Sequence, residues 1–587
     1  MNTDRHRWVK VVELMVGFWL AAGGLMAGSV MKPDIDPKSG IDMELESWLE
    51  RCPQAGMVPV TWKVSNATRV PLTWQLDFSS GNGYGSSAVR NSSYSITVQA
   101  GQKGELTLYV PVTQMMSGYY GGRDLEWKVT GHGVRGSGSL DSIGHSSSGT
   151  QYVGLSEGAV GTGGWNALDT ELGSGSSAKE LRGTELDMRK APEDWRGYTG
   201  LAQLWMTEGE WLAMSEVARA AVQDWVGFGG RMFVLVEDLG IERVAALGLP
   251  PMIGEGHPMG AGWVRRVEWD GKVLPVKEVA KWVREEHEDL NRVLVKYDDR
   301  WTLVKQMGRL NLNTPLVFGF MVVFGLLVGP VNLFWFAGAG RRSRLFWTTP
   351  LLSIAGSLVL MVLMIVQDGF GGTGVRQVLV MLQPESKRMG VVQEQASKTG
   401  VLVGSAFAKG EPMMLTPLNV ERSRSSSQMK DEFEETNQSA SGSWFASRSI
   451  QAQLMMSVRP TRAAVEFFAS AEPGGAPEVL SSVGVALDEV YVRDMKGAVW
   501  KVSDLGTGER RRMEASSLKE LLEWMEKEME VQAGPTMKAM LEGLRSREGF
   551  VFAVADETGD LAMESLDSIR WEGSRLLVVG PVQKDEG

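Results

Sequence analysis

The stretches that decide the fold are PLVFGFMVVFGLLVGPVNLFWFAG, residues 315–338, and FWTTPLLSIAGSLVLMVLMIV, residues 346–366. Neither contains a charged residue. A helix needs about 20 apolar residues, at about 1.5 Å each, to cross the hydrocarbon core of a bilayer. Both stretches are long enough, so the sequence predicts two transmembrane helices rather than a buried hairpin of a soluble domain.

The connector between these stretches, residues 339–345, contains Arg341, Arg342 and Arg344. Short loops rich in Lys and Arg stay on the cytoplasmic side of a membrane. The three arginines therefore predict a cytoplasmic loop. The segments before residue 312 and after residue 369, which hold most of the mass, are then expected on the outer side.

Asn332, beside Pro330, is the strongly polar residue of the first stretch, near its cytoplasmic end. It has two interpretations: a hydrogen bond to a partner helix, or a Pro and Asn pair that shapes the helix exit. The second is favoured. Neither stretch contains an ionisable pair of the kind that transport sites carry, which argues against a transporter.

A third apolar stretch lies near the start of the chain. Arg5, Arg7 and Lys10 precede the largely apolar residues 11–30, in which Glu13 is the one charged residue, so residues 1–32 are expected to be a signal peptide or an N-terminal membrane anchor. A basic start followed by an apolar core predicts crossing from inside to outside, in agreement with the arginine connector. Retention as an anchor is favoured, which would give three spans.

Composition excludes several classes of protein. The net charge of −11 and the pI near 5.3 give no basic surface for nucleic acid. Cys52 is the one cysteine in 587 residues, so no intramolecular disulfide can form. Stability must therefore come from packed cores.

Alternating apolar and polar positions predict an extracytoplasmic β-sandwich at residues 36–135, because period two is the pattern of half-buried strands. The apolar positions are Val58, Val60, Trp62 and Val64; Leu72, Trp74, Leu76 and Phe78; Tyr94, Ile96 and Val98; Leu106, Leu108 and Val110; and Leu125, Trp127 and Val129. Five regularly spaced strands indicate a sandwich of about immunoglobulin size. The Ser- and Gly-rich residues 136–149 indicate a linker.

Strand and helix signals alternate over residues 150–312, which predicts an extracytoplasmic α/β domain. Strands are expected at residues 151–155, 201–206 and 232–236. A helix before the last strand is expected to bury one stripe of side chains and to stop at Gly229 and Gly230. The stripe consists of Met214, Val217, Ala218, Ala221, Val222 and Trp225.

Residues 375–587 are expected to form a β-rich extracytoplasmic domain with one or two helices. The strands are predicted at residues 375–382, 454–458, 490–502, 550–555 and 576–582. Polar, Ser-rich residues 421–449 are expected to be a mobile loop. Ser517 and Glu520 match a capping box. The helix that follows is expected to bury Leu518, Leu521, Leu522, Met525 and Met529.

Several short motifs resemble those of a bacterial membrane-protein family with an extracytoplasmic class I glutamine amidotransferase-like domain. They are PEDWRGYTGL (192–201), LWMT (204–207), VQDWVGFGGR (222–231), MFVL (232–235), GPVN (329–332), WTTP (347–350), LDEVYVR (487–493) and Gly580. The resemblance covers residues 150–587 loosely. It implies an amidotransferase-like fold for the α/β domain, a place in the bacterial cytoplasmic (inner) membrane, and membership of a larger envelope assembly.

The best-known activity of that fold does not carry over. Class I amidotransferases need a cysteine nucleophile with a histidine base, and Cys52 lies in the predicted sandwich. The α/β domain contains no cysteine, so glutaminase activity is excluded and no catalytic function is predicted.

Ser156 is a weak catalytic candidate. It lies in Gly154-Leu-Ser-Glu-Gly158, which matches the G-x-S-x-G elbow of serine hydrolases and follows a strand. His257 or His287 would then serve as the base. The elbow leads into a helix, whereas residues 159–164 are Gly-rich and expected to be flexible, so a plain turn after the strand is favoured.

No metal site or cofactor is predicted. The histidines, His6, His132, His145, His257 and His287, lack the spacing of known metal motifs. His287 lies in an acidic run, residues 285–289, which indicates either a zinc or pH-sensing site or a solvated helix face. The solvated face is favoured.

Together these patterns predict a non-enzymatic, membrane-anchored scaffold or binding protein of the bacterial cell envelope. Its expected partners are the lipid bilayer and membrane or envelope proteins. Two alternatives stay open: a periplasmic serine hydrolase that uses Ser156, and a ligand sensor coupled to a membrane complex.

Overall fold

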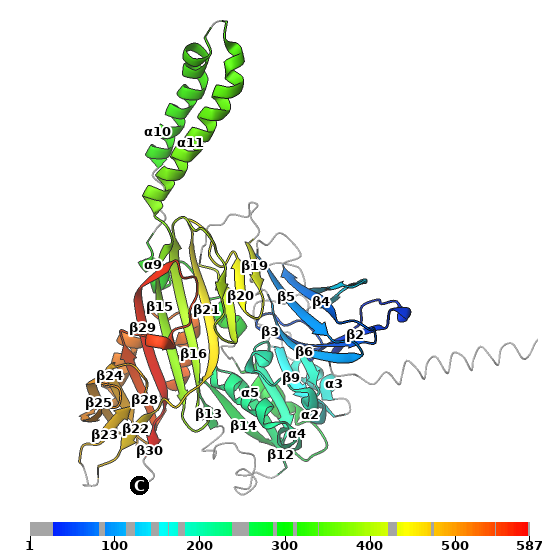
Figure 1. The fold of residues 1–587 in the computed structure, drawn as a ribbon. Coiled ribbons are helices and arrows are strands. Elements are labelled where there is room, and N and C mark those ends of the chain that lie inside the picture. Colours follow the sequence, from blue (N-terminus) through cyan, green and yellow to red (C-terminus); the bar gives the residue numbers. More distant parts are fainter. Residues whose placement is uncertain are drawn as a thin grey trace, which may run out of the picture. The chain divides into compact units, whose positions relative to one another are not determined.

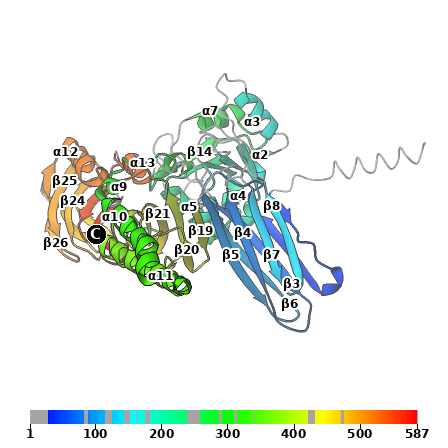
Figure 2. The ribbon, with the colours of Figure 1, turned by 90° about the horizontal axis from the view of Figure 1, so that it is seen from above.

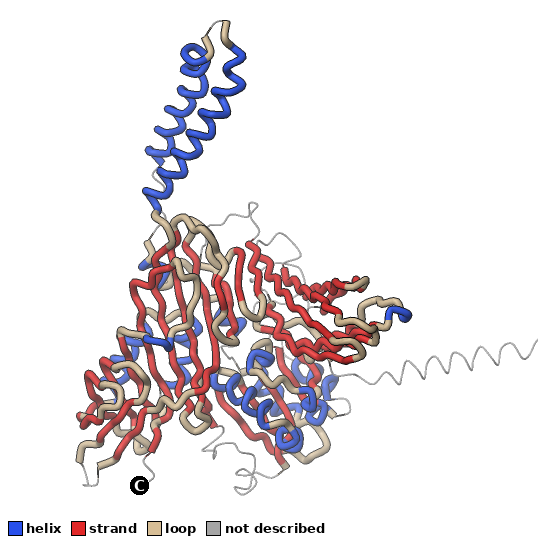
Figure 3. The backbone as a smooth tube through the Cα atoms, in the orientation of Figure 1, coloured by secondary structure: helices blue, strands red, loops and turns tan. Residues whose placement is uncertain are grey.

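The computed structural model describes residues 28–81, 88–112, 124–141, 152–161, 164–173, 182–237, 257–285, 290–308, 314–338, 340–420, 431–470, 475–545 and 547–584. The chain forms two compact units, Met1–Arg292 and Val293–Gly587. Both are rich in strands (Figure 3), so the expected multi-sheet, multidomain architecture is confirmed. Residues 1–27, most of the predicted signal peptide or anchor, lie outside the described residues.

The first unit begins with a pair of antiparallel sheets that share one core (Figures 1 and 2). One sheet has the order β1 (Ser29–Met31), β2 (Ile41–Ser47), β3 (Met57–Asn66) and β6 (Gln102–Pro111). The other has β5 (Ala88–Val98), β4 (Leu72–Gly81), β7 (Leu125–Gly131) and β8 (Val134–Leu140). Trp62 and Trp74 come from opposite sheets and are fully buried. The alternating segments all fall in strands, as predicted.

The predicted linker at residues 136–149 is partly wrong. Residues 136–140 belong to β8 and pair with β7, while residues 142–149 lie outside the described residues. The Gly and Ser content has a packing reason here. A Cβ at Gly138 would lie 2.8 Å from the indole of Trp127, so the missing side chain makes room for that ring.

A third sheet of this unit consists mostly of parallel strands. The order is β10 (Arg182–Leu186), β9 (Tyr152–Ser156), β11 (Gln203–Thr207), β12 (Arg231–Val236), β14 (Gly262–Glu268) and β13 (His257–Met259), with β13 antiparallel at the edge. The connecting helices include α2 (Glu157–Val160), α3 (Gly164–Gly173), α4 (Glu208–Ala213), α5 (Glu216–Gly227) and α7 (Val276–Arg284). Trp205 and Phe233 stack at 3.9 Å between ring centroids in the core.

Two local predictions fail in this sheet. Residues 159–164 were expected to be flexible, but residues 159–160 end α2 and residue 164 begins α3, while residues 162–163 lie outside the described residues. Val217 was expected in the buried stripe of α5, yet 56% of it is exposed. Each residue turns a helix by about 100°, so Val217 lies at the edge of the stripe that Ala218 and Val222 form.

The sandwich packs directly on the loops around the parallel sheet. Trp48 Nε1 donates to the Asp187 carbonyl at 3.1 Å, and the Trp48 ring lies edge-on to Tyr198 at 5.3 Å. The Met57 amide donates to Thr199 Oγ1 at 3.0 Å. These contacts explain why both sheet systems belong to one compact unit.

The second unit is built on a nine-stranded sheet in which β15 and β29 are parallel neighbours. Its order is β18 (Met413–Leu418), β21 (Ile450–Pro460), β16 (Arg388–Thr399), β15 (Gly372–Gln383), β29 (Ile569–Pro581), β28 (Phe550–Ala555), β24 (Leu487–Arg493), β25 (Val499–Leu505) and β27 (Glu514–Ser516). A smaller sheet has the order β26 (Arg510–Arg512), β23 (Glu478–Ser481), β22 (Val465–Phe468) and β30 (Gln583–Lys584). Shorter elements are α9 (Thr302–Gln306), β17 (Phe407–Ala408), β19 (Asp431–Glu435), β20 (Ser439–Gly442), α12 (Leu518–Trp524), the π-helical η6 (Met525–Glu530) and α13 (Pro535–Leu544).

The unit boundary falls earlier than the predicted end of the α/β domain at residue 312. Residues from Val293 onward belong to the second unit, and α8 (Leu290–Leu294) spans the boundary. Trp301 Nε1 donates to the Gln532 carbonyl at 3.0 Å, which ties this segment to the loop before α13.

The predicted mobile loop at residues 421–449 is also corrected. Residues 421–430 lie outside the described residues, but β19 and β20 form a hairpin. Phe433 packs on Trp444 at 4.8 Å between centroids, and Trp444 is fully buried. The Ser and Glu content misled the prediction because the segment has few aromatic residues, although Phe433, Trp444 and Phe445 are all buried.

Two smaller predictions differ in detail. Residues 490–502 form two strands, β24 and β25, joined by a turn in which the Asp494 amide donates to the Ala498 carbonyl at 2.9 Å. In α12 and η6 the buried face is the row Leu521, Met525 and Met529, whereas Leu518 and Leu522 are exposed.

The two apolar stretches form a helical pair within the second unit (Figure 1). The first comprises α10 (Thr314–Leu326) and the π-helical η4 (Leu327–Phe336); the second is α11 (Leu345–Asp368), preceded by the short η5 (Arg342–Arg344). Segments Pro315–Phe336 and Arg342–Gln367 are long and apolar enough to cross a membrane. The pair of long apolar helices is thus confirmed.

Candidate functional site

The helical pair exposes its apolar side chains instead of burying them. Phe318, Val323, Leu351 and Ile354 are among those exposed, and almost none of the side chains in either helix is buried. Exposed apolar surface of this extent marks a site that another apolar phase covers. The helical pair is therefore the main candidate for a functional surface.

The connector end of this pair combines positive charge with aromatic rings. Arg341, Arg342 and Arg344 are all exposed. Large aromatic side chains lie next to them and are exposed as well: Phe334, Trp335, Phe346 and Trp347. Aromatic belts and basic loops are typical of the boundary between a membrane and water.

Asn332 joins the two helices. Its side chain is fully buried, and Nδ2 donates to Thr349 Oγ1 of α11 at 3.0 Å. Pro330, two residues earlier, lacks an N–H, and η4 is wound as a π-helix around it, so the Asn332 carbonyl accepts from the Ala337 amide at 2.9 Å. The interhelical hydrogen bond, the less favoured of the two predictions, is present within the chain itself.

Ser156 lies at a different kind of site. It is fully buried at the end of β9, and Oγ accepts from the Ala159 amide at 3.2 Å as the N-cap of α2. Oγ donates to the Glu210 carboxylate. The other oxygen of Glu210 accepts from the Gly158 amide at 2.8 Å. Ser156 is thus part of a buried turn.

Glu210 also closes the capping box of α4. Its carboxylate accepts from the Thr207 amide at 3.0 Å and from Thr207 Oγ1 at 2.8 Å. One side chain therefore joins the carboxyl ends of two neighbouring parallel strands, β9 and β11. The sequence contained the Thr207–Glu210 capping pattern, but nothing in it linked that pattern to Ser156.

The histidine base that a hydrolase needs is not brought to Ser156 by the described residues. His257 lies in β13, in the same lateral row as Gly154, with β11, β12 and β14 between them. Four strand spacings amount to about 19 Å. His287 lies outside the described residues.

Glu394 is a buried titratable group that the sequence analysis missed. It is fully buried in β16; Oε1 accepts from Tyr297 Oη at 2.5 Å and from the Met537 amide at 3.0 Å, and Oε2 accepts from the Gly534 amide. Burial raises the pKa of the Glu394 carboxyl above its ordinary value, and these hydrogen bonds oppose the rise. The same burial, with the nearby carboxylate, raises the pKa of Tyr297.

Glu394 holds together three separate parts of the second unit: the segment before the helical pair, the central sheet and the start of α13. A Cβ at Gly534 would lie 2.6 Å from its Oε2, so the glycine permits this close approach. Across the described part of the chain, no group of three His, Cys, Asp or Glu side chains is arranged to hold a metal ion.

No protein-family model and no curated protein matches this chain. Among solved structures, the sporulation control protein Spo0M of Bacillus subtilis is similar over 18% of this chain and 48% of its own, at 12% identity and a TM-score of 0.12. A Paenibacillus cycloisomaltooligosaccharide glucanotransferase matches at 10% identity, 32% and 27% coverage and a TM-score of 0.17. A β-glucuronidase of glycoside hydrolase family 2 matches at 8% identity, 92% and 62% coverage and a TM-score of 0.17. This chain spans less than half the length of the first two.

Proposed function

We propose that this protein is a membrane-anchored, non-enzymatic scaffold of the bacterial cell envelope. The observation that carries the proposal is the pair of apolar helices whose side chains are exposed along their length. A bilayer is the environment in which such a surface is stable, because water would have to solvate every exposed Phe, Leu and Val. The helices act as the anchor and the strand-rich units as the binding modules.

The orientation follows from the connector. Arg341, Arg342 and Arg344 face the cytoplasm under the positive-inside rule, with the neighbouring aromatic side chains at the inner interface. Two spans return the chain to the side from which it came. The segment before Thr314 and the sheet that starts at Gly372 then both lie outside the cytoplasm.

The scaffold proposal also fits the state of Ser156. A serine nucleophile needs a base that removes its proton and a path for substrate. Ser156 is fully buried, and its hydroxyl donates to Glu210 while capping α2. We propose that the parallel sheet is a catalytically inactive, amidotransferase-like module that presents a surface to envelope proteins.

Cysteine accessibility tests the topology. Cys52 is buried, so a Cys52→Ala background removes the native thiol. Ser343→Cys then places a thiol in the connector, and Ser386→Cys places one in the exposed turn between β15 and β16. An impermeant maleimide added to spheroplasts is expected to label position 386, and position 343 only after permeabilisation. Equal labelling of both, or recovery of the full chain without membranes, would contradict the anchor.

An activity probe tests the non-enzymatic part in the same preparation. A fluorophosphonate that reacts with activated serines is expected to label wild type and Ser156→Ala equally weakly. Labelling that disappears in Ser156→Ala would instead establish a serine hydrolase. Thr207→Ala is a matched control, because it loosens the same capping box and leaves Ser156 in place.

A further inference from the structure

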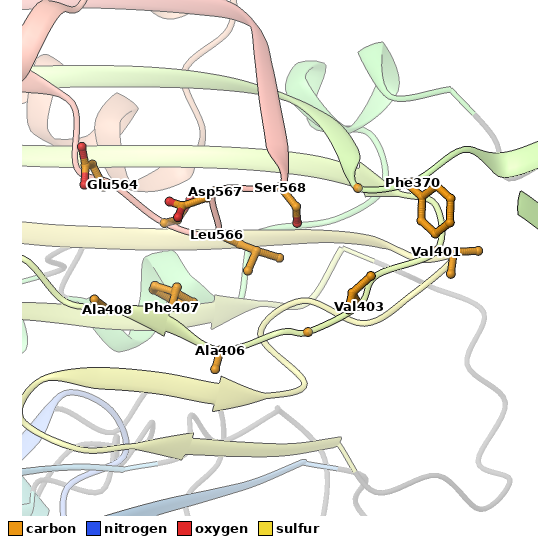
Figure 4. Close-up of a pocket in the computed structure, with 13 residues that line it drawn as sticks. Phe370, Val401, Val403, Ala406, Phe407, Ala408, Glu564, Leu566, Asp567 and Ser568 are labelled. Carbon is orange, nitrogen blue, oxygen red and sulfur yellow. The ribbon is translucent and has the colours of Figure 1, made fainter.

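A cleft lies at the foot of the helical pair, inside the second unit (Figure 4). Its volume is about 560 Å³. Figure 4 shows Phe370, Val401 and Val403 toward one end, with Phe407 and Leu566 farther along. Phe370 and Val403 are 66% and 95% exposed, although both are large and apolar.

The cleft is fastened to the end of α11 by backbone hydrogen bonds. The Val401 amide donates to the Gly369 carbonyl at 2.9 Å, and the Gly371 amide donates to the Val401 carbonyl at 3.1 Å. Phe370 follows the last residue of α11 by two positions, so its Cα lies within about 7 Å of that residue's Cα. A bilayer that surrounds α11 therefore reaches the apolar end of the cleft.

The opposite wall is the segment before β29. The Gly372 amide donates to the Ser568 carbonyl at 3.0 Å, and a Cβ at Gly371 would lie 2.3 Å from that oxygen, so the segment lies tight against the helix exit. This wall carries the exposed carboxylates of Glu564 and Asp567. Figure 4 shows Glu564 at the end farther from Phe370.

Ser565, in the same wall, adds an independent polar feature. It is 7% exposed and lines the cleft, and its Oγ has no hydrogen-bond partner among the described residues. A buried hydroxyl without a partner destabilises the folded state. The wall that carries the two carboxylates therefore also contains an unsatisfied hydroxyl, next to Glu564 in sequence.

We propose that the cleft binds a phospholipid of the surrounding outer leaflet whose headgroup carries an ammonium group. The proposal rests on the membrane anchor of the proposed function. The cleft and a lipid change from apolar to charged in the same direction. The apolar end of the cleft lies at the bilayer, as acyl chains do, and its carboxylates lie farther from it, as a headgroup does. An acyl chain packs on Phe370, Val403 and Leu566, and the ammonium group pairs with Glu564 and Asp567.

The positive charge of Arg448, near the end of α11, complements the negative phosphate of such a lipid. The Arg448 amide donates to the Gly400 carbonyl at 2.9 Å, and its Nη1 lies 3.3 Å from Met364 Sδ in the last turns of α11. Met364 lies about one turn before the end of α11 at Asp368, and an arginine beside the outer end of a span can extend its guanidinium to lipid phosphates. A headgroup with both phosphate and ammonium fits this arrangement better than a purely anionic one.

Lipid selectivity of the purified full chain tests the proposal. The probes are fluorescent phosphatidylethanolamine and phosphatidylglycerol with identical acyl chains, titrated into protein in mild detergent. The protein is expected to prefer phosphatidylethanolamine, and Glu564→Gln with Asp567→Asn is expected to reduce that preference about three- to fivefold. Glu557→Gln, an exposed acid of the same unit outside the cleft, is expected to leave it unchanged.

A filling variant addresses the apolar half. Ala406 is an exposed lining residue, so Ala406→Trp is expected to fold and to weaken binding of both lipids, whereas Val531→Trp, away from the cleft, is not. Equal affinity of wild type for both lipids, or unchanged binding in Ala406→Trp, would overturn the lipid site. Membrane labelling of position 386 remains intact in that case, which separates failure of the cleft from failure of the anchor.

Discussion

Two strands of this protein are buried to the same extent by opposite means. Strand β12 in the first unit is buried along its whole length, and after Arg231 it consists only of apolar residues, Met232, Phe233, Val234, Leu235 and Val236. Strand β16 in the second unit is buried over nine consecutive residues, 389–397, and includes polar side chains. Hydrophobicity alone explains the burial of residues 232–236 in the first strand but not that of the polar residues 393–395 in the second.

The polar side chains of β16 are buried because each has specific partners. Gln393 forms two hydrogen bonds with the Met563 backbone. Its Nε2 donates to the Met563 carbonyl at 3.0 Å, and its Oε1 accepts from the Met563 amide at 2.7 Å. Gln395 Nε2 donates to Gln453 Oε1 at 3.0 Å, and Gln453 Nε2 donates to the Trp444 carbonyl at 2.7 Å. Glu394 points to the other face, toward Tyr297 and α13.

The two strands differ in whether the interactions that bury their side chains depend on direction. Apolar packing is non-directional, so β12 tolerates changes that keep volume. Hydrogen bonds in a dry interior are directional, and a lost partner leaves a buried donor unsatisfied. We therefore expect the loss of a hydrogen-bonding side chain in β16 to cost more than a volume-conserving substitution in β12.

The largest effect is expected at Glu394. Glu394→Ala leaves the Gly534 and Met537 amides and the Tyr297 hydroxyl without their acceptor, which is expected to destabilise the start of α13 by about 3 kcal/mol or more. Hydrogen exchange of the α13 amides in the full chain measures the loss. Leu235→Met in β12 keeps the side-chain volume and is expected to cost less than about 1.5 kcal/mol. Equal costs at the two sites would remove the distinction between the strands.

A pH dependence is expected at the same residue. The pKa of Glu394 is raised in the folded protein above the ordinary 4.5, so the folded state keeps a proton that the unfolded chain has lost. The free energy of unfolding therefore falls as pH rises from about 4.5 through the folded-state pKa. Hydrogen exchange of the α13 amides is compared between wild type and Glu394→Gln over this pH range. The difference between the two gives the contribution of Glu394 titration to stability. A wild-type profile parallel to that of Glu394→Gln would show that Glu394 does not titrate there.

The sequence predicted the apolar part of this comparison and missed the polar part. Period two placed the sandwich strands, and the run from Met232 to Val236 placed β12, because burial of apolar residues leaves a local pattern. The partners of Glu394 come from positions 297, 534 and 537, so no window around residue 394 contains them. A buried Val-Gln-Glu-Gln segment cannot be distinguished from an exposed one without those long-range contacts.

The same limit applied to the candidate sites. The arginine connector and the apolar helices were visible because they are contiguous in sequence. The hydrogen bond between Ser156 and Glu210 joins residues about 50 positions apart in the sequence. The cleft brings Glu564 and Asp567 to the same site as Phe370, which lies about 200 positions earlier. The polar hairpin of β19 and β20 was missed for a related reason, since its aromatic residues are few and are separated by Ser and Glu.

Asn332 combines the two kinds of burial, because it is a hydrogen-bonded side chain in an otherwise apolar helix. Its substitution is expected to have the smallest effect on stability. Asn332 is one buried amide in an apolar helix, with Thr349 as partner of its Nδ2. Hydrogen bonds between membrane helices contribute about 0.6 kcal/mol on average. Asn332→Leu is therefore expected to weaken the helical pair slightly, because the lost bond is partly offset by removal of the buried Asn332 Oδ1, which has no partner among the described residues.

Spin labels at the exposed positions Leu316 and Val366, in the Cys52→Ala background, measure this effect. The distance between the labels is followed as SDS replaces a mild detergent around the full chain. Asn332→Leu and Thr349→Val are each expected to shift the opening midpoint slightly, and the double variant by no more than the larger single shift, because both remove the same bond. Additive shifts would show that Asn332 and Thr349 act independently. The helices would then be held together by apolar packing, such as that of Gly356 against Phe324, which is the kind of interaction that also buries residues 232–236 of β12.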